Sequence, residues 1–277
     1  VPLQLTQFPS MRIAFLVMDG AGRNNKKSPF RDVRIRRAIA HAINRPEIAR
    51  NVFGETSKVM HSLCYPKQAG CEQDVRRYEY NPDKARKLLR AAGYGPAGKY
   101  RFADQLNNLA EDLPGKPVEK TRRLRSIIAD IVSYRNHPAS EAMTFYLKAI
   151  GIDSSIDAYS SFEKAQLGFQ RNGFDVAHMT WASHGALDVA EILNPLFRNG
   201  TLDYCRDHEI NRWLDVAANS NNAQARHRAY SKALKRLQEM ACVVPLFNYT
   251  TFYAYSRHLD FQPTLDDIPR FYRAKWK

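Results

Sequence analysis

Blocks of hydrophobic and polar residues along the chain predict strands and helices that follow one another. An almost unbroken apolar run, Met11–Asp19, indicates a buried strand. A polar link follows, and after Asp32, which is a good N-cap, apolar residues recur close to the helical spacing. The apolar positions of this predicted helix are Val33, Ile35, Ile39, Ala42 and Ile43.

Proline, asparagine and glycine mark the ends of two further helices. Pro46 fits the first turn of a helix that ends at Gly54. Asn81 caps another helix, Pro82 occupies its first helical position, and Gly93 stops it. The stretch between these two helices has the composition of a loop.

Strands and helices alternate over the second half of the chain, after an irregular, charged stretch at 96–125. This order predicts an α/β fold in which a mixed or parallel sheet is covered by helices. The predicted strands are 127–134, 152–159, 174–181 and 243–256, and the predicted helices are 138–151, 161–171, 209–218 and 223–241. In the helix at 138–151, one side consists of Ala142, Phe145, Tyr146 and Ala149.

Composition and charge narrow the class of protein. The chain has 277 residues, of which 44% are hydrophobic and 25% are charged, as in soluble globular proteins. It has no apolar run of the roughly 20 residues that a membrane-spanning helix needs. The net charge of +14 favours anionic partners.

The distribution of the basic residues weakens the case for nucleic acid. They are scattered over the predicted helices, without a basic motif interleaved with aromatic residues and without zinc-finger spacing. We interpret the charge as a property of the solvated surface and expect no nucleic-acid partner. A basic nucleic-acid-binding protein is the alternative.

Four cysteines bear on the redox environment. Cys64 and Cys71 enclose a short loop that contains proline and glycine. In an oxidising compartment they would form a disulfide worth about 2–3 kcal/mol, and in the cytosol they would be free thiols or half of a metal site. Their spacing is wider than a CxxC ligand pair, which disfavours zinc. Cys205 is far from Cys242 in sequence, and Cys242 has the setting of a small, buried apolar residue.

The segment 173–189 gathers polar residues around a tryptophan. Its strand should place Phe174, Val176 and His178 on one face, and it ends at Trp181. The polar turn that follows contains Ser183, His184 and Asp188.

This composition suggests three kinds of site, two of which we disfavour. Ser183 and His184 are adjacent, so their side chains diverge, and the chain has no G-x-S-x-G motif; we therefore expect no catalysis. His178 and His184, six residues apart, are weak evidence for a metal, and we expect neither a metal nor a cofactor. A ligand-binding wall is the third kind.

Several motifs, in order, resemble the C-terminal half of the extracellular solute-binding proteins of ABC importers, family 5, which includes the dipeptide, oligopeptide and nickel type. Together they cover most of the chain, and the ending IPRFYRAKWK also resembles that group. The motifs are residues 28–54, 80–95, 142–153, 174–181 and 225–256.

The resemblance implies a two-lobed receptor of the venus-flytrap type (type II periplasmic-binding-protein fold) on the periplasmic or extracellular side of the bacterial membrane. It also implies that most of the N-terminal lobe is missing. Residues 1–27 would then form the crossover and hinge strand, 28–241 the second lobe, and 242–277 the return strand and a tail that packs towards the first lobe. The implied partners are a small peptide-like or anionic solute and an ABC permease in the inner membrane, and we expect a monomer.

The resemblance also implies which residues line the cleft. In this family the strand that ends in tryptophan and the turn after it face the ligand. Peptide-binding members carry an aspartate three residues after the tryptophan, where it pairs with the peptide amino terminus; this chain has His184 there. That difference favours a less cationic ligand, or one with a carboxylate or phosphate. The predicted ligand-binding residues are Trp181, His184, Ser183, His178, Asp188 and Tyr159.

Overall fold

A computed structural model of the chain describes residues 2–94, 124–128, 138–161, 163–164, 167–168 and 174–277. The strands are β1 (Leu3–Met18), β2 (Leu124–Ile128), β3 (Ser154–Ala158), β4 (Val176–Trp181), β5 (Val243–Ser256), β6 (Leu259–Asp260) and β7 (Lys275–Trp276). The α-helices are α1 (Val33–Ala42), α2 (Arg45–Ile48), α3 (Pro82–Ala91), α5 (Pro138–Ala149), α7 (Ala190–Leu196), α8 (His208–Ala218) and α9 (Ala223–Met240). Shorter helical segments are η1 (Pro29–Arg31), η2 (Ala49–Phe53), which has π-helical geometry, and η3 (Phe271–Arg273).

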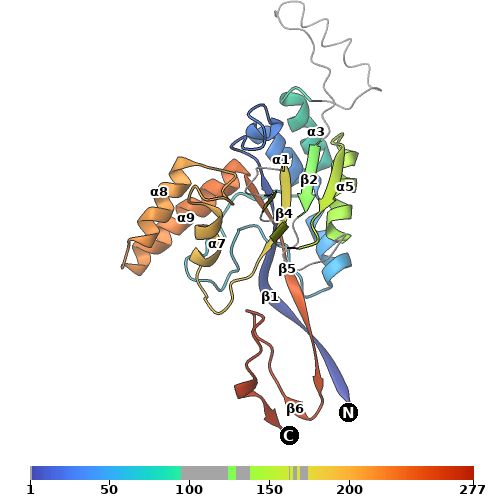
Figure 1. Ribbon diagram of the computed structural model, residues 1–277, viewed down its shortest axis with the longest axis vertical. Coiled ribbons are helices and arrows are strands. Elements are labelled where there is room, and N and C mark those ends of the chain that lie inside the picture. Colours follow the sequence, from blue (N-terminus) through green and yellow to red (C-terminus); the bar gives the residue numbers. More distant parts are fainter. Residues whose placement is uncertain (1, 95–123, 129–137, 162, 165–166, 169–173) are drawn as a thin grey trace, which may run out of the picture.

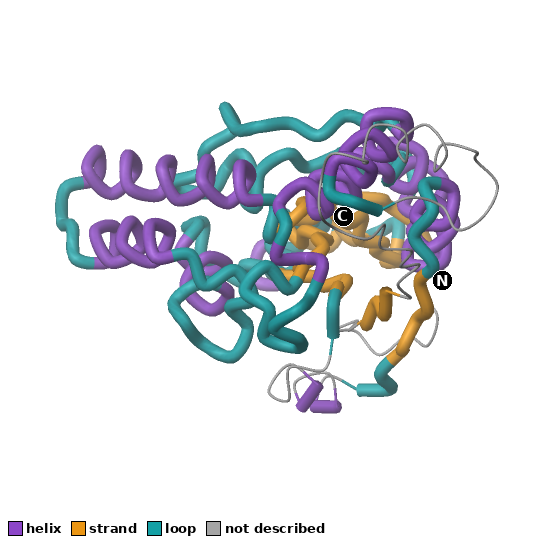
Figure 2. Tube along the Cα trace, turned by 90° about the horizontal axis from the view of Figure 1, so that it is seen from above, coloured by secondary structure: helices purple, strands orange, loops and turns teal. Residues whose placement is uncertain are grey.

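The main body is a mixed sheet between two layers of helices, as predicted. The sheet order is β3-β2-β4-β1-β5; β2 is parallel to both β3 and β4, whereas β1 is antiparallel to β4 and β5. α1, α3 and α5 lie on one side of the sheet and α7, α8 and α9 on the other (Figure 1). α8 and α9 run alongside each other and project away from the sheet (Figure 2).

Each face of the sheet has its own hydrophobic core. Ala177 and Met179 of β4 belong to the cluster under α7, α8 and α9, and Val176 belongs to the cluster under α1, α3 and α5. The alternation predicted for this strand is therefore correct within the strand. Phe174, however, precedes β4 and packs with Ala177 and Met179, not with Val176.

β1 and β5 continue beyond the body as a two-stranded ribbon. In the ribbon, residues 3–9 of β1 pair with residues 250–256 of β5. An irregularity of register between Pro9 and Ile13 separates the ribbon from the paired strands of the body. Figure 1 shows that the N-terminus, the C-terminus and β6 all lie at this end of the molecule.

Local sequence signals set the helix ends where we predicted them. The Asp32 side chain accepts a hydrogen bond from the Arg34 amide at 2.8 Å, and the Asn81 side chain accepts one from the Lys84 amide at 2.8 Å. Gly54, after η2, has a φ of 80°, in the left-handed region that favours glycine.

Some predicted helices and strands differ from the structure, and others fall on residues that the structure does not describe. α5 buries Ala139, Ser140, Met143 and Leu147. On the side named from the sequence, Ala142 and Tyr146 are partly buried against the core, whereas Phe145 is 70% exposed. β2 starts at Leu124, earlier than predicted, and residues 129–134 lie outside the described residues. So do most of the stretch at 96–125 and much of the helix predicted at 161–171.

Two disulfides join segments of the body. One links Cys64 and Cys71, whose Cα atoms are 5.6 Å apart. The other links Cys205 and Cys242, with Cα atoms 5.4 Å apart. Cys242 is buried, as predicted, but as half of a cross-link that ties the start of β5 to the segment between α7 and α8.

Candidate functional site

The candidate site begins at the end of β4, where the strand delivers Trp181. Trp181 pairs in register with Ile13 of β1, so it lies beside the point where β1 leaves the body for the ribbon. Its side chain is half-buried and packs against the cluster under α7, α8 and α9. One part of the indole is therefore fixed by the core, and the other part stays accessible.

The disulfide loop between Cys64 and Cys71 supports the turn that follows Trp181. Ser183 is buried, and its hydroxyl accepts a hydrogen bond of 2.7 Å from the Gln68 side-chain amide. The backbone of the loop joins the same turn, because the Ala69 amide donates to Leu187 O at 2.6 Å and Ala69 O accepts from the Val189 amide at 3.0 Å. The disulfide limits the conformations of this loop and so helps to hold the turn.

Asp188 ends the turn and is occupied by structural contacts. Its carboxylate accepts a hydrogen bond from the Ala190 amide at 2.8 Å, at the start of α7. It also forms an ion pair of 2.9 Å with Arg226 of α9. Asp188 therefore anchors the turn to α7 and α9.

Among the polar residues of the turn, His184 is the exposed one, and it reaches the C-terminal tail. Its Nδ1 lies 3.3 Å from the backbone oxygen of Asp266. The Asp266 carboxylate is paired with Arg270 at 2.5 Å. Hydrogen bonds from the Arg270 guanidinium hold the pKa of the Asp266 carboxyl well below its usual range.

His178 and Tyr159 lie away from this turn. His178 is only 3% exposed, and its Nδ1 is 2.9 Å from the Ser140 hydroxyl of α5. Tyr159, just beyond β3, is half-buried and packs against the cluster under α7, α8 and α9. A Cβ on Gly168 would lie 2.7 Å from the Tyr159 hydroxyl, so this close approach depends on glycine.

Of the six residues predicted to bind ligand, the structure brings four together in one short segment, namely Trp181, Ser183, His184 and Asp188. Two members of the surrounding site were missed, because they come from distant parts of the chain: Gln68 of the disulfide loop, and Asp266 of the tail. Near Gln68, only the two cysteines that enclose it, Cys64 and Cys71, indicated an ordered loop. The motif at the C-terminus gave no signal for a contact with His184.

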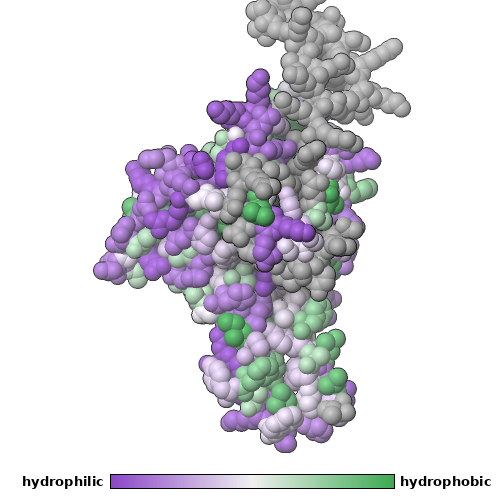
Figure 3. Space-filling view, in the orientation of Figure 1, coloured by the Kyte–Doolittle hydropathy of each residue, from purple (hydrophilic) through white to green (hydrophobic). Residues whose placement is uncertain are grey.

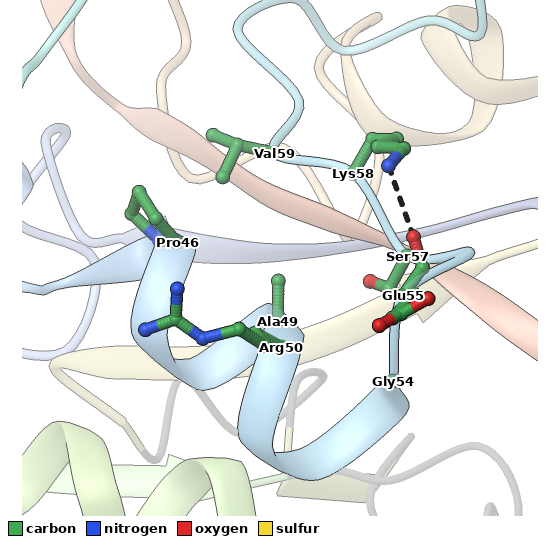
Figure 4. A pocket seen from close by; sticks show the side chains of 8 residues that line it. All are labelled: Pro46, Ala49, Arg50, Gly54, Glu55, Ser57, Lys58 and Val59. Carbon is green, nitrogen blue, oxygen red and sulfur yellow. Dashed lines mark hydrogen bonds between the residues drawn. The ribbon is translucent and has the colours of Figure 1, made fainter.

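A separate hollow of about 420 Å³ is formed by α2, η2 and the segment after them (Figure 4). Lys58, at its rim, donates a hydrogen bond of 2.9 Å to the backbone oxygen of Glu55. None of the predicted ligand-binding residues lines this hollow. Its lining consists of Pro46, Ala49, Arg50, Gly54, Glu55, Ser57, Lys58 and Val59.

The described residues contain neither a candidate metal cluster nor a candidate membrane-spanning helix. No group of three or more histidine, cysteine, aspartate or glutamate side chains there is arranged to hold a metal ion. In the same part of the chain, every helix is too short or too polar to cross a membrane.

Comparison with known proteins identifies relatives over nearly the whole chain. The family described as bacterial extracellular solute-binding proteins, family 5 Middle, matches residues 3–203. The Escherichia coli dipeptide-binding protein is 31% identical over 91 residues, which are 33% of this chain and 16% of that protein. The glutathione-binding protein GsiB of Salmonella choleraesuis is 24% identical over 277 residues, covering 93% of this chain and 46% of its own length.

Solved structures agree with this fold. The Helicobacter pylori periplasmic binding protein DppA, in complex with the peptide STSA, matches with a TM-score of 0.78 and 18% identity, over 100% of this chain and 49% of that one. A dipeptide-binding protein from Pseudoalteromonas, in complex with Met-Leu, matches with a TM-score of 0.75 and 18% identity, over 99% and 50% of the two chains. Where a relative matches nearly all of this chain, the match thus covers only about half of that relative.

Proposed function

Because the chain belongs to the bacterial extracellular solute-binding proteins of family 5, we propose that it is part of the substrate-binding component of an ABC importer. It would capture a peptide-like solute and deliver it to a membrane permease. The observation that carries this proposal is the family match over residues 3–203, supported by the likeness to peptide-binding structures over the whole chain. The family is periplasmic or extracellular, which is the location predicted from the sequence.

Trp181 and His184 are the proposed ligand contacts. The Trp181 side chain is half-buried and the His184 side chain is exposed; Trp181 is the last residue of β4, and His184 lies three residues beyond it. Ser183 and Asp188 would act on the ligand indirectly, by holding the turn on the disulfide loop and on α7. A direct ligand role for His178 and Tyr159, which lie apart from the turn, has less support.

The ribbon and tail are proposed to pack towards a first lobe. In this division, residues 1–27 cross between lobes, 28–241 form the second lobe, and 242–277 return to the first. Support comes from the apolar side chains that the ribbon end of the molecule exposes (Figure 3). These are Leu3, Leu5, Phe252, Phe271, Tyr272 and Trp276.

A peptide-like ligand fits the site, in which an aromatic ring offers area beside a polar turn. The relatives named above bind dipeptides or glutathione, and one is in complex with the peptide STSA. Those relatives are binding proteins, and we propose that this chain likewise has no catalytic activity. The preference for an anionic solute rests on His184 and on the net charge, and it stays a prediction, as does the monomeric state.

Calorimetry with a panel of di- and tripeptides and glutathione tests this function, using a form of the protein that also carries an N-terminal lobe. We expect binding by at least one member of the panel. Trp181→Ala should weaken that binding about tenfold, which corresponds to about 1.4 kcal/mol. Trp213→Ala is the matched control, because Trp213 of α8 is also half-buried and packs against the same cluster, and it should leave the affinity unchanged.

A gel-shift assay with duplex DNA separates the solute receptor from the nucleic-acid alternative. A solute receptor should not shift DNA at about 150 mM salt. Tight binding there, with a steep decrease as salt increases, together with no response to any solute of the panel, would overturn the proposed function.

A further inference from the structure

The segment 264–270 of the tail lies against the turn that follows β4. Asp266 offers its backbone oxygen to His184 Nδ1 at 3.3 Å. On the neighbouring residue, a Cβ added to Gly185 would lie 3.9 Å from Ile268 Cδ1. The tail therefore contacts the turn at His184, and the Ile268 side chain lies near Gly185.

This segment is itself anchored to both strands of the ribbon, near the place where they leave the body. The Met11 amide of β1 donates to Leu265 O at 2.7 Å. The Asp267 carboxylate accepts hydrogen bonds of 2.6 Å from Ser10 of β1 and from Thr251 of β5. The oxygen that faces His184 thus has a fixed position relative to β1, and β1 also positions Trp181.

The chemistry of this contact sets the tautomer of His184. A backbone oxygen can only accept a hydrogen bond, so Nδ1 must carry the proton. A neutral imidazole has one N–H group, and its Nε2 is then an acceptor. Among the described residues, Nε2 of His184 has no hydrogen-bond partner, and the side chain is exposed.

The charges around this contact are compensated. The Asp266 carboxylate is 2.8 and 2.5 Å from the two Arg270 nitrogens, and Arg12 is 3.9 Å from the Asp267 carboxylate. Neither positive nor negative charge is in excess beside the imidazole ring. The hydrogen bond from Nδ1 therefore determines whether Nε2 is a donor or an acceptor towards a ligand.

We propose that the segment 264–270 is a positioning element of the binding site, which holds His184 as the Nδ1–H tautomer so that Nε2 accepts a hydrogen bond from an N–H group of the solute. This inference rests on the proposed function for its ligand. It narrows the solute to one with an N–H donor at that position. Because Nε2 of this tautomer cannot donate to a carboxylate or phosphate, the predicted preference for an anionic solute would then rest on the net charge alone. In this role Asp266 and Arg270 act through His184 and do not contact the solute.

Imidazole ¹⁵N spectra of the chain at a pH where the histidines are neutral test the proposal. His184→Asn identifies the signals of this ring among those of the eight histidines. We expect His184 to be mainly the Nδ1–H tautomer, whereas a free imidazole in water favours Nε2–H. A majority of the Nε2–H tautomer in the unaltered protein would overturn the proposal.

Variants of the tail separate positioning from a general structural role. Arg270→Ala releases the Asp266 side chain and should shift His184 towards Nε2–H, whereas Arg270→Lys should retain the Nδ1–H majority. Arg273→Ala, in the same tail but without a contact to Asp266, is the control and should change nothing. An unchanged tautomer in a folded Arg270→Ala protein would also overturn the proposal. If peptides fail to bind while the tautomer is as expected, the solute-binding function fails and this geometry stands.

Discussion

The two halves of the β1–β5 pair have the same backbone pairing but opposite surroundings. In the body, Phe15 of β1 and Phe247 of β5 are both 0% exposed, because helices cover the two faces of the sheet. In the ribbon, Leu3, Leu5 and Phe252 are 61%, 68% and 55% exposed. Strand pairing alone therefore does not bury apolar side chains. The comparison indicates that the body supplies the stability of the chain, and the ribbon supplies an uncovered apolar surface.

The difference between body and ribbon should be largest for two matched phenylalanine substitutions on β5. Phe247→Ala removes a ring from the core between β5 and η2 and should lower the free energy of unfolding by about 3–5 kcal/mol. Phe252→Ala, five residues along the same strand, should change it by less than about 0.5 kcal/mol. Urea unfolding measures both. Equal losses would contradict the division into body and ribbon.

Removal of the disulfide between Cys205 and Cys242 should have the next largest effect. The cross-link closes a loop over a sequence separation of 37 residues, so the double substitution to serine should cost about 2–4 kcal/mol of unfolding free energy. The Cys64–Cys71 pair, with a separation of 7, should cost less on the same loop-closure account. Hydrogen exchange of ribbon amides should be the same in both variants and in the parent. Selective loss of ribbon protection would show that the body cross-links support the ribbon.

The smallest expected effect is a pH dependence confined to the tail and ribbon. Arg270 lowers the pKa of Asp266 in the folded state, so the pair stabilises the fold above the unfolded pKa of about 3.9 and loses this effect as pH falls through the lower folded pKa. After correction for intrinsic rates, the Met11 amide, which donates to Leu265 O, should exchange faster in Arg270→Ala at neutral pH. This difference should decrease as the pH falls below 4. A difference that is constant with pH would exclude the ion pair as its cause.

The order of strands and helices could be predicted because its signals are local. Asp32 and Asn81 cap their helices by hydrogen bonds to amides two or three residues away, so the sequence window contains the whole interaction. α7 was missed because it has only seven residues and contains Pro195. The full set of buried residues on α5 could not be predicted, because it depends on where the sheet lies; Ser140 is buried there beside His178 of β4.

The site could be predicted only in part, for a similar reason. The segment from Trp181 to Asp188 is continuous in sequence, and its composition is unusual enough to be seen. The residues that hold this segment in place are distant in sequence. Gln68, which donates to Ser183, is 115 residues away from it, and Asp266, whose backbone oxygen contacts His184, is 82 residues away from it. The disulfide between Cys205 and Cys242 likewise could not be predicted, because these residues are 37 positions apart and only the fold brings them together.

We propose that this chain supplies one wall of a two-lobed solute receptor, with an apolar ribbon that packs towards the other lobe. Calorimetry should compare the same peptide-like ligand on the 277-residue chain and on a form that also carries an N-terminal lobe. We expect the two-lobed form to bind, and the chain by itself to bind at least about a hundredfold more weakly, a difference of about 2.7 kcal/mol. Equal affinity for the two forms would contradict the claim.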